Sequence, residues 1–185
     1  MITLRKIIQK TIEILILTIF GKERLAKFLG VTIGKKCRIY IREWGSEPFL
    51  IHIGNNVTVT SGVTFLTHDG STCLVFNESG FRYQKYGSIY VGNNVFIGVN
   101  TIIMPGVIIG DNVVIGAGSI VTNNIPDNVV AIGTPAKVVS SFQSYCHKIQ
   151  KTCADDEMLS VHEIYKDKVY AAIEVQNSKA NKIDG

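Results

Sequence analysis

One histidine in this chain of 185 residues stands where it could act as a base. Imidazole, with an ordinary pKa of about 6.5, is the side chain best suited to taking up a proton near neutral pH. His68, in the stretch FLTHDG, directly precedes a long segment with little apolar periodicity and is expected to point outward. We interpret His52 as an ordinary surface residue, and His147 and His162 fall in the C-terminal region. We therefore predict that His68 is a general base.

A base of this kind needs a partner for its second ring nitrogen, because that contact fixes the orientation of the imidazole. The candidates are Glu47, Asp69, Glu78 and a backbone carbonyl group. Glu47 lies 21 residues upstream of His68, and Asp69 directly follows His68. We name Glu47 and Asp69 as candidate catalytic residues, and the sequence leaves open which group orients His68.

A repeat of six residues indicates the elements that position these side chains. From Val91 to Pro126 the chain reads VGNNVF, IGVNTI, IMPGVI, IGDNVV, IGAGSI and VTNNIP, and the same register appears upstream from Ile53. Each hexapeptide begins with a β-branched aliphatic residue, which predicts a short strand, and contains Gly or Asn, which tolerate the left-handed backbone of a corner. Three such sides predict a triangular coil of about eighteen residues, with coils stacked about 4.8 Å apart.

Two interruptions of the repeat divide the chain. One lies at residues 43–50, and the other is the inserted loop 71–88, whose length is typical of functional or mobile loops. We predict an N-terminal amphipathic helix over residues 1–30, a catalytic β-helix domain over residues 31–139, and a C-terminal helix and tail over residues 140–185.

These repeats resemble those of the hexapeptide-repeat acyltransferases, which have a left-handed parallel β-helix. The segment IPDNVVAIGTPAKVV, residues 125–139, is similar to the one that closes the last coil in maltose and galactoside O-acetyltransferases. The layout also resembles that of capsule and colanic-acid O-acetyltransferases. The resemblance implies an all-β fold with short terminal helices and an acetyl-CoA-dependent O-acetyltransferase. It further implies a homotrimer that acts on a sugar hydroxyl in cell-envelope or capsular polysaccharide biosynthesis.

The resemblance also assigns roles to residues. It places the catalytic histidine at the base of an extruded loop, which is the position of His68. Backbone at Gly98 or Val99 would hold the oxyanion, and the CoA arm would lie along the last coils. The expected contacts of that arm are Gly116, Ala117, Thr122 and, for a phosphate, Lys137. The expected acceptor pocket uses Trp44 of the first interruption and the loop residues Phe76, Arg82, Tyr83 and Tyr86; the alternative is that these side chains pack the loop onto the coil.

The composition of the chain limits the classes of molecule that it is expected to bind. The net charge of +4 comes without a dense Lys/Arg stripe, so we predict no nucleic acid partner, and the four cysteines and four histidines show no metal-binding spacing. We predict a cytoplasmic protein whose N-terminal helix packs on its own protein or a neighbouring subunit; peripheral docking on a membrane is the alternative. Two other functions stay open, which are N-acetyl transfer to an amino sugar and a non-catalytic trimeric scaffold.

Overall fold

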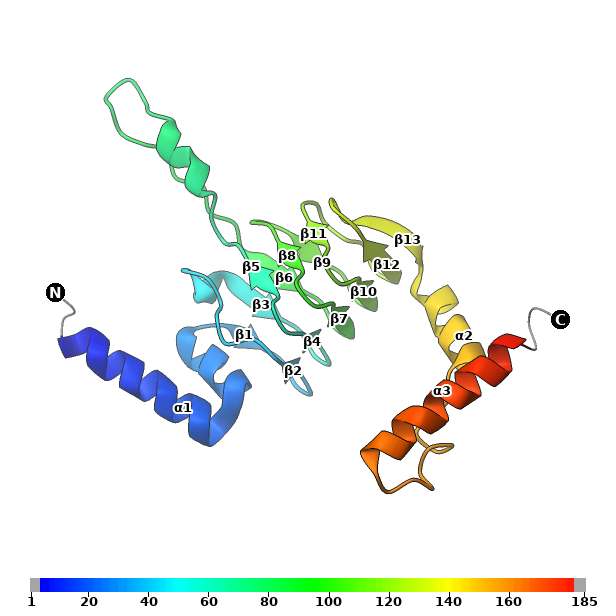
Figure 1. The fold of residues 1–185 in the computed structure, drawn as a ribbon. Coiled ribbons are helices and arrows are strands. Elements are labelled where there is room, and N and C mark those ends of the chain that lie inside the picture. Colours follow the sequence, from blue (N-terminus) through cyan, green and yellow to red (C-terminus); the bar gives the residue numbers. More distant parts are fainter. Residues whose placement is uncertain (1–3, 182–185) are drawn as a thin grey trace. The chain divides into compact units, whose positions relative to one another are not determined.

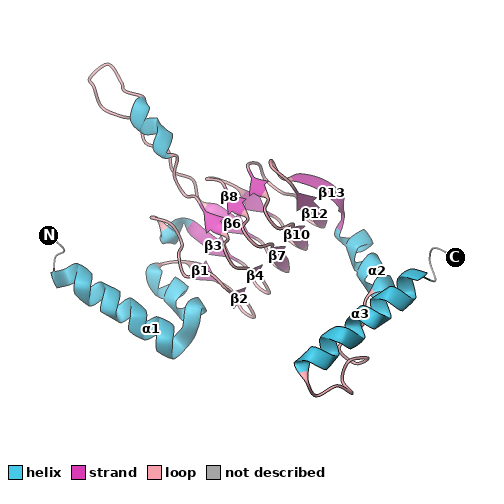
Figure 2. Ribbon diagram, in the orientation of Figure 1, coloured by secondary structure: helices cyan, strands magenta, loops and turns pink. Residues whose placement is uncertain are grey.

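The structure, a computed structural model, describes residues 4–181 and divides into two compact units, Met1–Ser140 and Ser141–Gly185 (Figure 1). The first unit is a stack of coils whose short strands form three parallel sheets (Figure 2). The first sheet has the order β1 (Thr32–Ile33), β3 (Ile51–Ile53), β6 (Ile89–Val91), β9 (Ile108–Ile109). The second has the order β13 (Lys137–Ser141), β12 (Val129–Ile132), β10 (Val113–Ile115), β7 (Val95–Ile97), β4 (Thr58–Val59), β2 (Arg38–Ile39). The third has the order β11 (Ile120–Val121), β8 (Ile102–Ile103), β5 (Thr64–Phe65).

The register of the strands confirms the predicted coil. Tyr90 pairs with Ile108 and Ile102 pairs with Ile120, so one turn of the β-helix takes eighteen residues. The aliphatic residue that opens each hexapeptide faces the interior, where it stacks on the corresponding residue of the next coil. The buried residues of these stacks include Ile53, Val91 and Ile109 on one side, Val59, Ile97 and Ile115 on the second, and Phe65, Ile103 and Val121 on the third. Burial of this apolar surface is the main term that stabilises the stack.

One corner of the triangle carries a ladder of asparagine side chains. Asn56, Asn94, Asn112 and Asn128 all have positive φ, between 53° and 62°. The amide of Asn56 donates to Asn94 at 2.8 Å, Asn94 donates to Asn112 at 2.8 Å, and Asn112 donates to Asn128 at 3.0 Å. Asparagine therefore serves twice at this corner, because it tolerates the left-handed backbone and links consecutive coils.

Replacing Asn112 by alanine is expected to lower the free energy of unfolding by about 2–3 kcal/mol, the sum of two neutral hydrogen bonds and a left-handed alanine. Asn112→Gly loses the same hydrogen bonds without the backbone strain, so its loss should be about 1 kcal/mol smaller. Urea unfolding of the three proteins measures both differences. Wild-type stability in Asn112→Ala would contradict a stabilising ladder.

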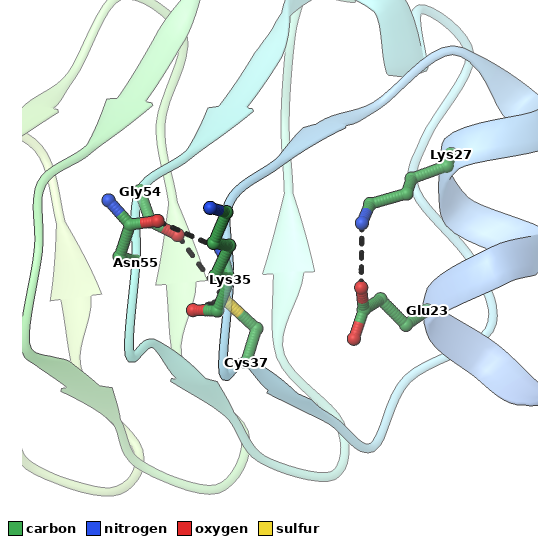
Figure 3. A network of polar contacts seen from close by, with 6 residues as sticks. All are labelled: Glu23, Lys27, Lys35, Cys37, Gly54 and Asn55. Atoms are coloured by element: carbon green, nitrogen blue, oxygen red, sulfur yellow. Dashed lines mark hydrogen bonds and ion pairs between the residues drawn. The ribbon is translucent and has the colours of Figure 1, made fainter.

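The N-terminal helix α1 (Leu4–Leu29) is broken at Gly21, whose φ of 78° and ψ of −177° are not helical. The buried residues of α1, Leu25 and Ala26, lie after this break, where the helix packs on the coils. Figure 3 shows that part beside the first coil, with the Lys27–Glu23 ion pair of 2.7 Å on the helix. In the coils, the backbone nitrogen of Lys35 donates to Asn55 Oδ1 at 2.9 Å (Figure 3). This hydrogen bond ties the first coil to the second at one corner of the triangle.

The second unit is a helical hairpin. It contains α2 (Phe142–Thr152) and α3 (Tyr165–Asn181), which pack on each other. Lys179 Nζ donates to the Cys153 carbonyl at 2.7 Å and so joins the end of α3 to the end of α2. The predicted β-helix with N-terminal and C-terminal helices is thus confirmed, but the all-β class is too narrow, because 34% of the chain is helical. Within residues 4–181, no helix is long and apolar enough to cross a membrane.

Candidate functional site

The imidazole of His68 lies against a carboxylate that comes from another coil. His68 Nδ1 is 2.9 Å from Glu47 Oε2, and the same carboxylate oxygen accepts a hydrogen bond of 2.5 Å from Thr67 Oγ1. The side chain of Glu47 is 18% exposed, whereas that of His68 is 42% exposed. The structure therefore sets Nδ1 of His68 toward the protein and leaves its other ring nitrogen, Nε2, for a molecule arriving from solvent.

Glu47 is ionised in this arrangement. The hydrogen bond from Thr67 is the largest cause that holds the pKa of the Glu47 carboxyl below its usual value, and the hydrogen bond with His68 comes second. Partial burial opposes both but does not outweigh them. A charged Glu47 favours the tautomer of His68 that carries its proton on Nδ1, so Nε2 is the basic nitrogen.

A buried ring and a tight turn hold Glu47 in place. Trp44, 2% exposed, stacks on Phe65 of β5 with ring centroids 5.3 Å apart and anchors the interruption between the first two coils. Gly45 follows with a φ of 72°, and a Cβ at this position would lie 3.0 Å from the Phe65 carbonyl oxygen. Glu47 then opens the short turn η1 (Pro48–Leu50), which leads into β3. The turn and the stacked ring thus aim the carboxylate at the start of the inserted loop.

Trp44, one of the residues expected near an acceptor, is 2% exposed in this structure and packs against Phe65. Its ring fills the end of the core, and its Nε1 is buried without a hydrogen-bond partner among residues 4–181. A buried unpaired donor costs free energy, so packing must outweigh that cost. We assign Trp44 a packing role that positions Glu47.

The inserted loop begins at His68. His68 and Tyr86 form an antiparallel β-bridge, and the backbone nitrogen of Gly87 donates to the Thr67 carbonyl at 2.8 Å. Beyond this base the loop runs away from the coils, as the green segment in Figure 1 shows, and includes the turn η2 (Gly70–Leu74). The Tyr86 ring lies 6.1 Å from that of His68. The loop thus brings one of its predicted aromatic residues to the imidazole.

Asp69 is engaged within the loop rather than with His68. Its Oδ1 accepts from the Ser71 nitrogen at 3.1 Å and from the Ser71 hydroxyl at 2.6 Å, and its Oδ2 lies 3.4 Å from Lys85 Nζ. The hydrogen bond from the Ser71 hydroxyl is the largest cause that lowers the pKa of the Asp69 carboxyl. Of the two carboxylates predicted from the sequence, the structure brings Glu47, and not Asp69, to Nδ1 of His68.

An open pocket of about 450 Å³ lies beside His68. It contains Thr122, one of the residues predicted to contact CoA, and Asp69. Its other lining residues are Leu66, Gly70, Lys85, Met104 and Pro105. The predicted acceptor residues Phe76, Arg82 and Tyr83 are exposed on the projecting part of the loop and do not line this pocket. Within one chain, therefore, the loop supplies Lys85 and Tyr86, and not those three, to the surroundings of His68.

The backbone residues predicted to hold the thioester lie at the preceding corner of the triangle. The N–H groups of Gly98 and Gly116 are already bound, to the carbonyls of Ile115 and Ala131, both at 2.9 Å. The N–H groups of Val99 and Ala117 have no acceptor within residues 4–181 and remain available. A Cβ on Gly98 would lie 2.4 Å from the Ala117 nitrogen, so the close stacking of these two corners requires glycine. None of these residues lines the pocket of His68 in the same chain.

Lys137, the predicted phosphate contact, is exposed in β13, where its charge is accessible to an anion.

Thr67 is 1% exposed and was not among the residues predicted from the sequence. The alternation of side chains along β5 places Phe65 and Thr67 inside and His68 beyond them, which is the signal that could have identified Thr67.

Comparison with known proteins places the chain in a family. Residues 88–123 match the family described as bacterial transferase hexapeptide (six repeats). Protein CapG of Staphylococcus aureus is 47% identical over 138 residues, which cover 73% of this chain and 80% of CapG. Galactoside O-acetyltransferase of Escherichia coli (strain K12) is 39% identical over 136 residues, which cover 64% of this chain and 67% of that enzyme.

A solved structure agrees with the sequence comparison. A galactoside acetyltransferase in complex with coenzyme A is 32% identical, with a TM-score of 0.51, and the match covers 69% of this chain and 72% of that one. The matched repeat and this structural likeness imply a left-handed winding of the coils. The chain therefore belongs to the hexapeptide-repeat family of acetyl-CoA-dependent O-acetyltransferases.

Proposed function

We propose that this chain transfers the acetyl group of acetyl-CoA to a hydroxyl group of a saccharide in cell-envelope or capsular polysaccharide biosynthesis, with His68 as the general base. The observation that carries the proposal is the contact of 2.9 Å between His68 Nδ1 and Glu47 Oε2, which leaves Nε2 free at the edge of an open pocket. A galactoside acceptor is named for relatives of this chain, which supports a sugar as the acceptor class.

The reaction proceeds in one transfer between two bound substrates. Nε2 of His68 takes the proton of the acceptor hydroxyl, and the oxygen attacks the carbonyl carbon of the thioester. When the tetrahedral intermediate collapses, the carbon–sulfur bond breaks, and the imidazolium returns its proton to the departing CoA sulfur. Glu47 holds the imidazole and stabilises its positive charge while the proton resides there.

Backbone N–H groups are suited to stabilise the negative charge that develops on the thioester oxygen. We assign this role to the unpaired N–H of Val99, and the neighbouring unpaired N–H of Ala117 to the amide-containing arm of CoA. Both groups lie on a different corner from His68, so one chain does not bring base and donors together. A second copy that presents its Val99 corner to His68 would complete the site, so we propose composite sites between subunits, in the homotrimer that the family resemblance implies, and an enzyme that acts in the cytoplasm.

Two measurements test the proposal. Calorimetric titration of the purified protein with acetyl-CoA should show saturable binding at about one site per chain. Release of the CoA thiol in the presence of monosaccharides and nucleotide sugars should then identify acceptors, and the product should lose its acetyl group in mild alkali. An ester does so, whereas an amide resists. The absence of acetyl-CoA binding by a folded oligomer would contradict the proposal, and an alkali-stable product would redirect it to an amino group.

Thr67 is expected to support the reaction through Glu47. Thr67→Val keeps the shape of this buried side chain but removes the hydroxyl that donates to Glu47, so we expect kcat to fall about 10-fold, equivalent to one hydrogen bond to a charged group. The KM for acetyl-CoA should stay unchanged. Thr67→Ser, which keeps the hydroxyl, should recover most of the activity. If serine and valine reduced kcat equally, the effect would belong to packing and not to the hydrogen bond.

A further inference from the structure

The first seventeen described residues, Leu4–Phe20 of α1, form a helix that packs on little else in the chain. Eight of its ten large apolar side chains are exposed, from 40% for Ile12 to 72% for Leu4, and the other two, Ile16 and Leu17, are half-buried. The fully buried side chains of α1 lie after the break at Gly21, where Leu25 and Ala26 are buried and Lys22 Nζ donates to the Tyr40 carbonyl at 2.7 Å. An exposed apolar surface of this size in a soluble protein indicates a partner.

The exposed side chains form a stripe. Leu4, Ile8, Leu15 and Ile19 follow one another at intervals of four and seven residues, and Ile12 lies at the edge of the same face. Towards Phe20 the helix becomes apolar on almost every side, since residues 14–20 read ILILTIF. Seventeen residues of helix extend over about 26 Å, which is short for a crossing of the bilayer but sufficient to lie in its interface.

The charge of this helix favours an anionic surface over a second copy of the same helix as its partner. Leu4–Phe20 contains the cations Arg5, Lys6 and Lys10 and the single carboxylate Glu13, a net charge of +2 from three positive and one negative group. The three cations are exposed, and none forms an ion pair within the described residues. Pairing this helix with the same helix of a second copy would bring six cations together against two carboxylates. An anionic surface removes that repulsion and attracts all three cations.

We propose that Leu4–Phe20 is an interfacial helix that attaches the protein to an anionic lipid surface. The apolar stripe enters the boundary between head groups and acyl chains, while Arg5, Lys6 and Lys10 meet the lipid phosphates from the polar face. The break at Gly21 lets this helix take an orientation that the packed part of α1 does not dictate. Attachment would favour lipid-carried saccharides as acceptors; that consequence rests on the proposed function, whereas attachment itself does not.

Flotation of the full chain with lipid vesicles, without acetyl-CoA, tests this inference. We expect the protein to float with vesicles of phosphatidylcholine and phosphatidylglycerol, at least about 10-fold more than with phosphatidylcholine alone, and to be released by high salt. Ile8→Glu combined with Leu15→Glu should abolish flotation. The matched control, Val161→Glu combined with Ile164→Glu, adds the same charge at exposed apolar positions of the other unit and should float like the wild type.

A second variant separates lipid from protein as the partner. Lys6→Glu combined with Lys10→Glu keeps the apolar stripe and should lose the preference for anionic vesicles while the molar mass in light scattering stays at the wild-type value. Wild-type protein that stays unbound with both vesicle types overturns the inference. So does a fall in molar mass in the Ile8 and Leu15 variant without any flotation of the wild type, because the stripe would then be a contact between subunits.

Discussion

Replacing His68 by alanine is expected to lower the rate of acetyl transfer by about 10²–10⁴-fold, the range that general base catalysis contributes. The imidazole of His68, the base that we propose, lies at the edge of the pocket with Nε2 free to meet an incoming hydroxyl, because Nδ1 faces Glu47. Removing it leaves the acceptor proton to water. Steady-state release of the CoA thiol at saturating acetyl-CoA measures the loss.

The affinity for acetyl-CoA should be unchanged in His68→Ala, since Val99 and Ala117 offer their N–H groups from the backbone of another corner. Calorimetry separates this outcome from a general loss of structure. His52→Ala is the matched control, because His52 is also a partly exposed histidine of the β-helix, stacked on Tyr90 at 4.6 Å and remote from the pocket. Equal turnover of His68→Ala and the wild type would remove the base from the mechanism.

The coils were predictable from the sequence because each six-residue repeat by itself specifies one strand and one corner. A β-branched residue every six positions can fill a narrow triangular interior only if each hexapeptide is one strand and one corner, and the pairing of Val95 with Val113 follows from counting three hexapeptides. The phase of the repeat also places His68 beyond a strand of the third sheet and Gly98 beyond a strand of the second. The phase of the repeat therefore separates the proposed base from the proposed oxyanion donors within one chain.

The partner of His68 was not predictable in the same way. Asp69 is adjacent in sequence, but its carboxylate caps the turn that starts the loop and takes the hydrogen bonds of Ser71. Glu47 comes from an interruption with no periodicity, and its position depends on the burial of Trp44 and the turn at Gly45. A single aromatic residue looks the same in a sequence whether it packs in a core or lines a pocket, so the sequence leaves both roles open for Trp44.

Glu47→Gln is expected to lower kcat by about 10–100-fold, the usual effect of removing a group that orients a catalytic imidazole. The amide keeps the size of the side chain, and its one acceptor oxygen can still meet Thr67 and His68, but it carries no charge to stabilise the imidazolium. The KM for acetyl-CoA should not change. Glu43→Gln, an exposed carboxylate of the same interruption, is the matched control and should retain wild-type kcat.

The same variant makes a prediction about stability. Because the pKa of Glu47 is lowered in the folded state, first by Thr67 and then by His68, its charged form stabilises the fold above the unfolded value of about 4.3. That contribution disappears as the pH falls through the lowered folded pKa, so the difference in melting temperature between wild type and Glu47→Gln should shrink below about pH 4. A difference in melting temperature that is constant from pH 7 to pH 3 would show that the contacts of Glu47 with Thr67 and His68 do not depend on its charge. The role of Glu47 in orienting the base would then rest on the shape of its side chain alone.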